Sequence, residues 1–206
     1  NIKQNDSDIV YTETKYLLIG NGNVTFADSS ENGFGKWTTN QGWALTSSQF
    51  YSPNNSFTDS PSGNYPDNAS NSLTMSLPLN VSASPVSFLN FRHKYDTEVG
   101  YDYCYVEVSS NNGSSWQTVT SYNGLQSSWT EQNLDITSFA NSSAQMKVRF
   151  TLKSDQYVTA DGWYIDDIKI INYNSFINSV MTNVNMTVAP EGFYNSNTNS
   201  LNMNDT

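Results

Sequence analysis

The ten residues DGWYIDDIKI, at positions 161–170, alternate like a β-strand on either side of two adjacent aspartates. Trp163 and Ile165 share one phase of the two-residue period, whereas Ile168 and Ile170 share the other. A regular strand therefore cannot bury all four side chains on one face. One extra residue at the aspartates would correct the phase. The stretch predicts a strand with a β-bulge, a feature that re-aims side chains and often lies beside functional sites.

Short alternating segments of this kind recur along the chain, separated by Gly, Asn, Pro and Ser, and no segment has a sustained helical period with caps. Two examples are 146–152 and 104–108, whose predicted inward sets are Met146, Val148, Phe150 and Leu152, and Cys104, Val106 and Val108. The sequence therefore predicts an all-β domain, built as a two-layer antiparallel β-sandwich of the jelly-roll type.

The chain divides into three predicted parts. Residues 1–21 are a lead-in segment that contains a first strand, and residues 22–173 are the jelly-roll domain. Residues 174–206 are rich in Asn and carry one further alternating stretch, which we interpret as a linker and the start of a truncated following β-domain. A tail strand that pairs with the main sandwich is the alternative. We interpret the whole as a piece of a longer protein, since it opens without Met or an apolar leader.

The composition favours cations as partners. The formal net charge is −10, with only 9 Lys and Arg residues, which argues against neutralising phosphates of nucleic acid or anionic membrane. No apolar run is long enough to span a bilayer, so we expect no membrane insertion. The single cysteine, Cys104, excludes an internal disulfide and a cysteine-based zinc site. The abundance of uncharged Asn, Ser and Thr suggests an extracellular protein.

Acidic residues lie at the ends of the predicted strands and in the loops. They are Asp28, Asp59, Glu98, Asp102, Asp155, Asp161, Asp166 and Asp167. Calcium needs six to eight oxygen ligands, and loops between strands can supply them from distant positions. The sequence therefore points to Ca²⁺, while solvated surface charge remains the alternative for each residue.

An ordered series of motifs extends this reading: TFADSSENGFGKWTTNQGWAL, SFTDSPSGNYPDN, FLNFRHKYDTEVGYDYCYVEVSSNNGSSW, MKVRFTLKSD and DGWYIDDIKI. Over about residues 22–173 the chain resembles the MAM-like jelly-roll modules attached to secreted bacterial and archaeal peptidases. Immune inhibitor A metalloproteases and the cleaved-adhesin domains of gingipain-type proteases carry similar modules. The resemblance implies a secreted or cell-surface protein whose partners are other domains of the same chain, with an extracellular protein or a glycan as further partners.

The resemblance also implies where calcium would bind. In such modules an acidic residue after a Phe near the first strand meets an Asp of the closing strand at one ion. Carried over, these residues are Asp28 and Asp166, although Ala27 here separates the acidic residue from its Phe. A second cluster is expected from Asp59, Glu98, Asp102 and Asp161.

Two other functions compete with a calcium-stabilised module. A Ser/His/Asp catalytic site would have to use His93, the only histidine, which is in phase with the apolar residues of its strand and is predicted to be a packed core residue. Paired carboxylates could instead serve a glycosidase, since their separation in space decides that chemistry. Glycan binding would use exposed aromatics such as Tyr101, Tyr103 and Tyr105, for which a covered position is the alternative.

The sequence thus predicts a non-catalytic, calcium-stabilised accessory module of a secreted multidomain peptidase or a surface adhesin, serving stabilisation, spacing or docking. A carbohydrate-binding module is the second interpretation and a hydrolase is the third.

Overall fold

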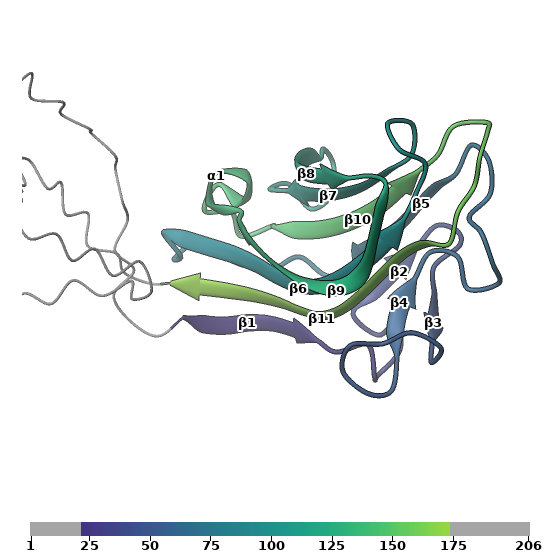
Figure 1. Cartoon of the computed structure of the whole chain (residues 1–206). Helices are drawn as coiled ribbons and strands as arrows, with labels where there is room; N and C mark the ends of the chain where they lie inside the picture. Colours follow the sequence, from purple (N-terminus) through teal and green to yellow (C-terminus); the bar gives the residue numbers. More distant parts are fainter. Residues whose placement is uncertain (1–21, 174–206) are drawn as a thin grey trace, which may run out of the picture. The chain divides into compact units, whose positions relative to one another are not determined.

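The computed structural model describes residues 22–173, which fold into two antiparallel sheets packed face to face (Figure 1). This architecture confirms the predicted all-β sandwich. The predictions for residues 1–21 and 174–206 lie outside the described residues.

The larger sheet has six strands in the described region. Its path runs β3-β4-β11-β6-β9, and β1 also pairs with β11. The strands are β1 (Asn23–Asp28), β3 (Ala44–Thr46), β4 (Ser56–Thr58), β6 (Val86–Asp96), β9 (Leu125–Asp135) and β11 (Gly162–Tyr173). Because β6 pairs along the length of β11, β4 and β1 share the opposite edge of β11, one after the other.

The second sheet has the order β2-β5-β10-β7-β8. Its strands are β2 (Trp37–Thr39), β5 (Ser70–Met75), β7 (Tyr103–Ser109), β8 (Gln117–Tyr122) and β10 (Lys147–Lys153). One helical turn, α1 (Thr137–Ala140), follows β9. Within residues 22–173, no helix has the length and apolar character that crossing a membrane would require.

The predicted bulge is present in β11. The register between β11 and β6 shifts between Asp166 and Lys169, and Asp167 has a φ of 49°. As a result, the side chains of Trp163, Ile165, Ile168 and Ile170 are all fully buried, at 0% exposure. The bulge thus keeps both halves of the strand facing the core.

The core lies between the two inner faces, as the alternation predicts. The predicted inward sets of 146–152 and 104–108, which include most of β10 and most of β7, are buried, with Met146, Val148, Phe150, Leu152, Cys104, Val106 and Val108 all at 0% exposure. Trp163 from the larger sheet packs edge-on against Phe150 from the smaller one, with ring centroids 5.6 Å apart. Aromatic pairs of this geometry add to the energy of area burial.

The strand register separates two ends of the sandwich. Asn23 of β1 pairs with Asn172 of β11, and Val86 of β6 pairs with Tyr173, so the described chain begins and finishes at one end. Gly162, at the start of β11, pairs with Asp96, the last residue of β6. The β6–β7 and β10–β11 loops therefore meet at the other end, which we call the loop end.

Candidate metal centre

Three carboxylates come together at the loop end. Glu98 and Asp102 belong to the β6–β7 loop, and Asp155 belongs to the β10–β11 loop. One potential ligand oxygen from each lies within 4.8 Å of the other two. Antiparallel pairing of β7 with β10 explains the meeting, because Tyr103 pairs with Lys153 and both loops lead away from that pair. We call these three residues the acidic triad.

Asp102 is fully buried and fixes the geometry of the triad. Its Oδ1 accepts a hydrogen bond of 2.8 Å from the backbone N–H of Asp155, which joins the two loops. Its Oδ2 accepts a bond of 2.6 Å from the hydroxyl of Tyr65, and that hydroxyl accepts one of 3.1 Å from the N–H of Glu98. Gly100, with a φ of 81°, allows the loop to turn so that Asp102 N–H reaches the Glu98 carbonyl.

One carboxylate oxygen of Glu98 lacks a hydrogen-bond partner among the described residues. Its Oε2 is buried, and no hydrogen-bond donor of the described residues reaches it. Burial, and then the charges of Asp155 and Asp102, raise the pKa of the Glu98 carboxyl. The ion pairs of residues 22–173 join Arg92 to Glu131 and Arg149 to Glu107, so neither offsets the triad.

This donor set could hold a metal ion. Calcium takes carboxylate oxygens from flexible loops, and an orphaned buried carboxylate oxygen costs free energy unless a cation or donor reaches it. Glu98, Asp102 and Asp155 would hold the ion, which would neutralise three mutually repelling charges and bridge the two loops.

Asp59 and Asp161, the other members of the expected second cluster, lie next to each other rather than in the triad. The hydroxyl of Ser60 contacts both residues, at the Asp59 side chain and the Asp161 carbonyl. Asp59 is 1% exposed, and its Oδ1 accepts a hydrogen bond of 2.6 Å from Trp163 N–H. Burial raises the pKa of Asp59 to about 7. Asp161 is exposed, and its carboxylate accepts a bond of 3.0 Å from the hydroxyl of Tyr164.

Asp28 lies at the end of β1, close to the bulge. Its Oδ1 accepts a hydrogen bond of 2.8 Å from Ser30 N–H, and its Oδ2 accepts one of 3.1 Å from the indole N–H of Trp37. It shares a surface hollow of about 140 Å³ with Asp167. Lys36 and Lys169 also line this hollow and bring two positive charges to it.

Asp166 is aimed at the β3–β4 loop. Its Oδ2 accepts hydrogen bonds of 2.9 and 3.0 Å from the N–H groups of Tyr51 and Ser52. Its Oδ1 accepts a bond of 2.7 Å from Asp167 N–H, while the Ser52 hydroxyl lies 3.4 Å from this oxygen and 3.1 Å from Asp167 Oδ1. A carboxylate has about four lone-pair sites, and backbone N–H groups engage three of them here. The bulge thus turns a buried carboxylate toward two backbone amides of the loop that joins the edge strand β3 to β4.

The comparisons with known proteins come from sequence and from structure. No family model matches the chain. Over 106 residues, or 52% of the chain, the sequence is 36% identical to Bacillopeptidase F of Bacillus subtilis strain 168. The match covers 7% of that protein's length. The chain is therefore similar to one small part of a much larger relative.

Solved structures share the fold. The C-terminal family 22 carbohydrate-binding module of Clostridium thermocellum Xyn10B matches with a TM-score of 0.52 at 13% identity, over 75% of this chain and 96% of that one. The K2 cleaved-adhesin domain of Lys-gingipain has a TM-score of 0.49 at 18% identity, over 71% of this chain and 98% of the domain. At its identity, the likeness to the Xyn10B module extends to the sandwich fold alone.

His93 is a packed core residue, as its position in the alternation predicts. It is 1% exposed, its Nδ1 accepts a hydrogen bond of 3.2 Å from the indole N–H of Trp163, and its Nε2 lies 3.1 Å from the side-chain amide of Gln132. Burial lowers the pKa of His93 to about 4. An indole can only donate, so Nδ1 is unprotonated and His93 is neutral.

Asp155 is the triad member that the sequence reasoning did not assign to a site, although it appears among the strand-end carboxylates. The available signal was its position directly after the strand that ends in LKS. That signal identifies a ligand only if β10 is known to pair with β7, since this pairing puts Asp155 beside Asp102.

Proposed function

We propose that this chain is a non-catalytic, calcium-stabilised β-sandwich module that serves as an accessory part of a secreted, multidomain peptidase. The acidic triad carries the calcium part of the proposal, through the orphaned Oε2 of Glu98. The similarity to part of Bacillopeptidase F supports the link to a peptidase, and the abundance of uncharged Asn, Ser and Thr supports an extracellular location. The module would stabilise, space or dock the rest of such a chain.

His93 supports the non-catalytic part of the proposal, because it is unsuited to a Ser/His/Asp site. The chain has one histidine, and it is buried and neutral between Trp163 and Gln132. A general base needs access to a substrate proton and a pKa near the working pH. A buried imidazole with a pKa of about 4 meets neither condition.

Calcium should raise the thermal stability of the chain. A ligand that binds the native state at a hundredfold excess over its Kd adds about 2.7 kcal/mol, which for a domain of this size raises Tm by about 5 to 10 °C. Calorimetric melting of the full chain in EDTA and in millimolar calcium chloride measures the shift. Equal Tm values in the two buffers would refute calcium stabilisation.

Two variants show where the stabilisation originates. Glu98→Gln removes one charge of the triad and should abolish most of the calcium-dependent rise in Tm. Asp67→Asn removes an exposed carboxylate at the same end of the sandwich that is not part of the triad, and it should keep the full rise. A Glu98→Gln variant that retains the parent's calcium response would exclude the triad as the binding site.

A further inference from the structure

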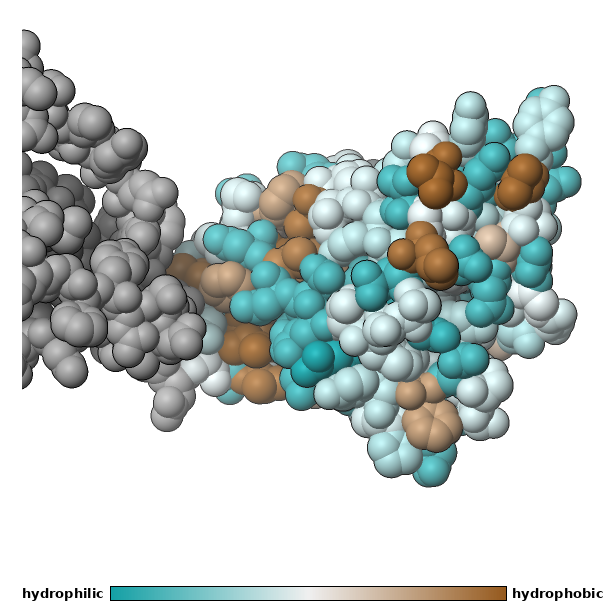
Figure 2. All heavy atoms as spheres, viewed as in Figure 1, coloured by the Kyte–Doolittle hydropathy of each residue, from teal (hydrophilic) through white to brown (hydrophobic). Residues whose placement is uncertain are grey.

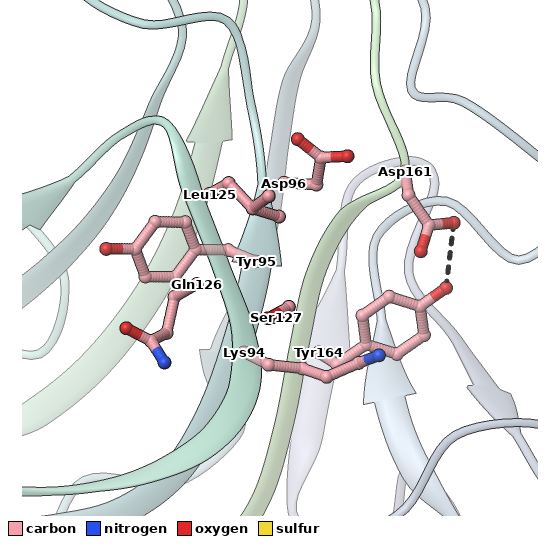
Figure 3. Close-up of a pocket in the computed structure, with 8 residues that line it drawn as sticks. All are labelled: Lys94, Tyr95, Asp96, Leu125, Gln126, Ser127, Asp161 and Tyr164. Carbon is pink, nitrogen blue, oxygen red and sulfur yellow. Dashed lines mark hydrogen bonds between the residues drawn. The ribbon is translucent and has the colours of Figure 1, made fainter.

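A surface hollow of about 170 Å³ lies at the loop end of the larger sheet (Figure 3). Its polar lining comes from three strands and the loop before β11: Lys94 and Asp96 from β6, Gln126 and Ser127 from β9, Asp161 from the loop and Tyr164 from β11. Figure 3 shows the Lys94 side chain extending toward the Tyr164 ring. Hydrogen-bond donors and acceptors thus surround an aromatic side chain.

Tyr164 has a fixed position in this hollow. Its hydroxyl donates to Asp161 at 3.0 Å, and the ammonium of Lys94 lies 4.8 Å from the centroid of its ring. Burial, and then the hydrogen bond to Asp161, raise the pKa of Tyr164 to about 12. The phenol therefore stays protonated, and Asp161 keeps lone pairs available for another donor.

A second aromatic group lies further back along β6, outside the lining of the hollow. The guanidinium of Arg92, two residues before Lys94, lies 4.5 Å from the centroid of the Tyr51 ring and 2.7 Å from the Glu131 carboxylate. The ring of Tyr51 meets that of Trp129 edge to face, with centroids 6.3 Å apart. Together, these side chains of the hollow and of the second group form what we call the outer strip: Lys94, Asp96, Gln126, Ser127, Asp161, Tyr164, Arg92, Glu131, Tyr51 and Trp129. It places the exposed ring of Tyr51 and the partly buried ring of Trp129 beside charged groups, whereas Tyr164 is only 6% exposed and lies beneath Lys94.

The β11 bulge fixes one wall of the outer strip. Asp166 holds the backbone amides of Tyr51 and Ser52, so Tyr51 stays over Arg92. In the same loop, the side-chain oxygen of Gln49 accepts a hydrogen bond of 2.9 Å from Lys94. The buried aspartate therefore preorganises surface groups that lie on a loop.

The charges of the outer strip select against charged ligands. Two cations, Lys94 and Arg92, face three carboxylates, Asp96, Asp161 and Glu131, and most are already paired with each other or with aromatic rings. The net charge of −10 further disfavours anions. A neutral ligand with many hydroxyl groups can use such donors and acceptors without displacing a charge.

Protein interfaces bury contiguous apolar area around their anchors. On the face of the module drawn in Figure 2, the hydrophobic residues near the right-hand edge are instead separate spots among hydrophilic ones. Tyr51 is 47% exposed. Rings of this kind, with a wet polar edge, offer flat faces to the C–H faces of sugar rings.

From these contacts we propose that the outer strip binds a neutral oligosaccharide, with the aromatic rings of Tyr51 and Trp129 receiving sugar rings and Lys94 and Asp161 bonding their hydroxyls. This function is independent of the proposed calcium site, because no member of the acidic triad lines the hollow.

Titration calorimetry of the full chain with cellohexaose, xylohexaose, mannohexaose and chitohexaose tests the proposal. We expect at least one of them to bind, and Trp129→Ala and Lys94→Met to weaken that binding about tenfold, as loss of one anchoring side chain does. Trp116→Ala is the matched control, since Trp116 is also partly buried and stacks with an arginine, Arg149, but on the other sheet. It should bind as the parent does.

Three results would overturn the proposal: no binding of any of the four sugars at millimolar concentration, unchanged affinity in both strip variants, or loss of affinity in Trp116→Ala alone. Thermal melts of each variant separate a lost contact from lost folding. Binding that persists in EDTA, together with a calcium-independent Tm, would support the strip while refuting the calcium proposal, so the two can fail separately.

Discussion

Asp166→Ala should lower the free energy of unfolding by about 3 kcal/mol, because it removes a buried carboxylate that holds the backbone amides of Tyr51 and Ser52. Both amides would lose their acceptor, and the β3–β4 loop would lose its attachment to β11. Urea unfolding measures the loss of stability. Amide hydrogen exchange should become faster at Tyr51 and Ser52 before it does in the sheet core.

Asp167→Asn is the control for this variant. Asp167 is the partly exposed neighbour in the bulge, with a φ of 49°, and Asn tolerates that conformation. Its stability should stay within about 0.5 kcal/mol of the parent. If Asp166→Ala unfolds at the parent's urea midpoint and its two loop amides exchange at the parent's rates, Asp166 does not fasten the loop.

The bulge illustrates what the sequence could predict in this fold. Phase alone requires an extra residue between Ile165 and Ile168, and the structure has it. The alternation of the sequence does not indicate which groups the redirected aspartate side chain contacts. The amides of Tyr51 and Ser52 lie over a hundred positions away in the chain, and only the pairing of β4 and β1 along one edge of β11 brings that loop to the bulge.

Acid should remove the stability that neutral His93 provides. Its pKa is about 4 in the folded protein and 6.5 ordinarily, so the native state disfavours the proton. This contribution is complete above pH 6.5 and is lost as the pH falls toward 4, by about 3 kcal/mol in all. Protonation would place an N–H of His93 against the indole N–H of Trp163.

The titration of Asp59 changes the free energy of unfolding with pH in the opposite direction. The contribution of His93 is therefore measured in a variant that lacks the Asp59 carboxyl. Its pKa of about 7, raised from 3.8, means that the native state takes up a proton before the unfolded state does, so this group adds stability as the pH falls from 7. Urea unfolding in EDTA should therefore compare Asp59→Asn with Asp59→Asn/His93→Gln. The stability advantage of the single variant should shrink by about 3 kcal/mol between pH 7 and pH 4. A constant advantage would contradict the role assigned to His93.

The candidate site was less predictable than the fold for a related reason. Glu98 and Asp102 are four residues apart in one loop, so local sequence suggested that they act together. Asp155 joins them through the pairing of β7 with β10, which is a long-range property of the jelly roll. Asp59 and Asp161 appeared equally suitable in sequence, but the fold directs them to Trp163 and Tyr164.

Anomalous diffraction from crystals of the chain grown in calcium tests the central claim most directly. The account predicts a calcium peak within coordination distance of oxygens from Glu98, Asp102 and Asp155, about 2.3 to 2.6 Å. It also predicts that Asp166 still accepts its hydrogen bonds from Tyr51 and Ser52 in those crystals. Calcium bound between Asp28 and Asp166, with the acidic triad free of metal, would contradict it.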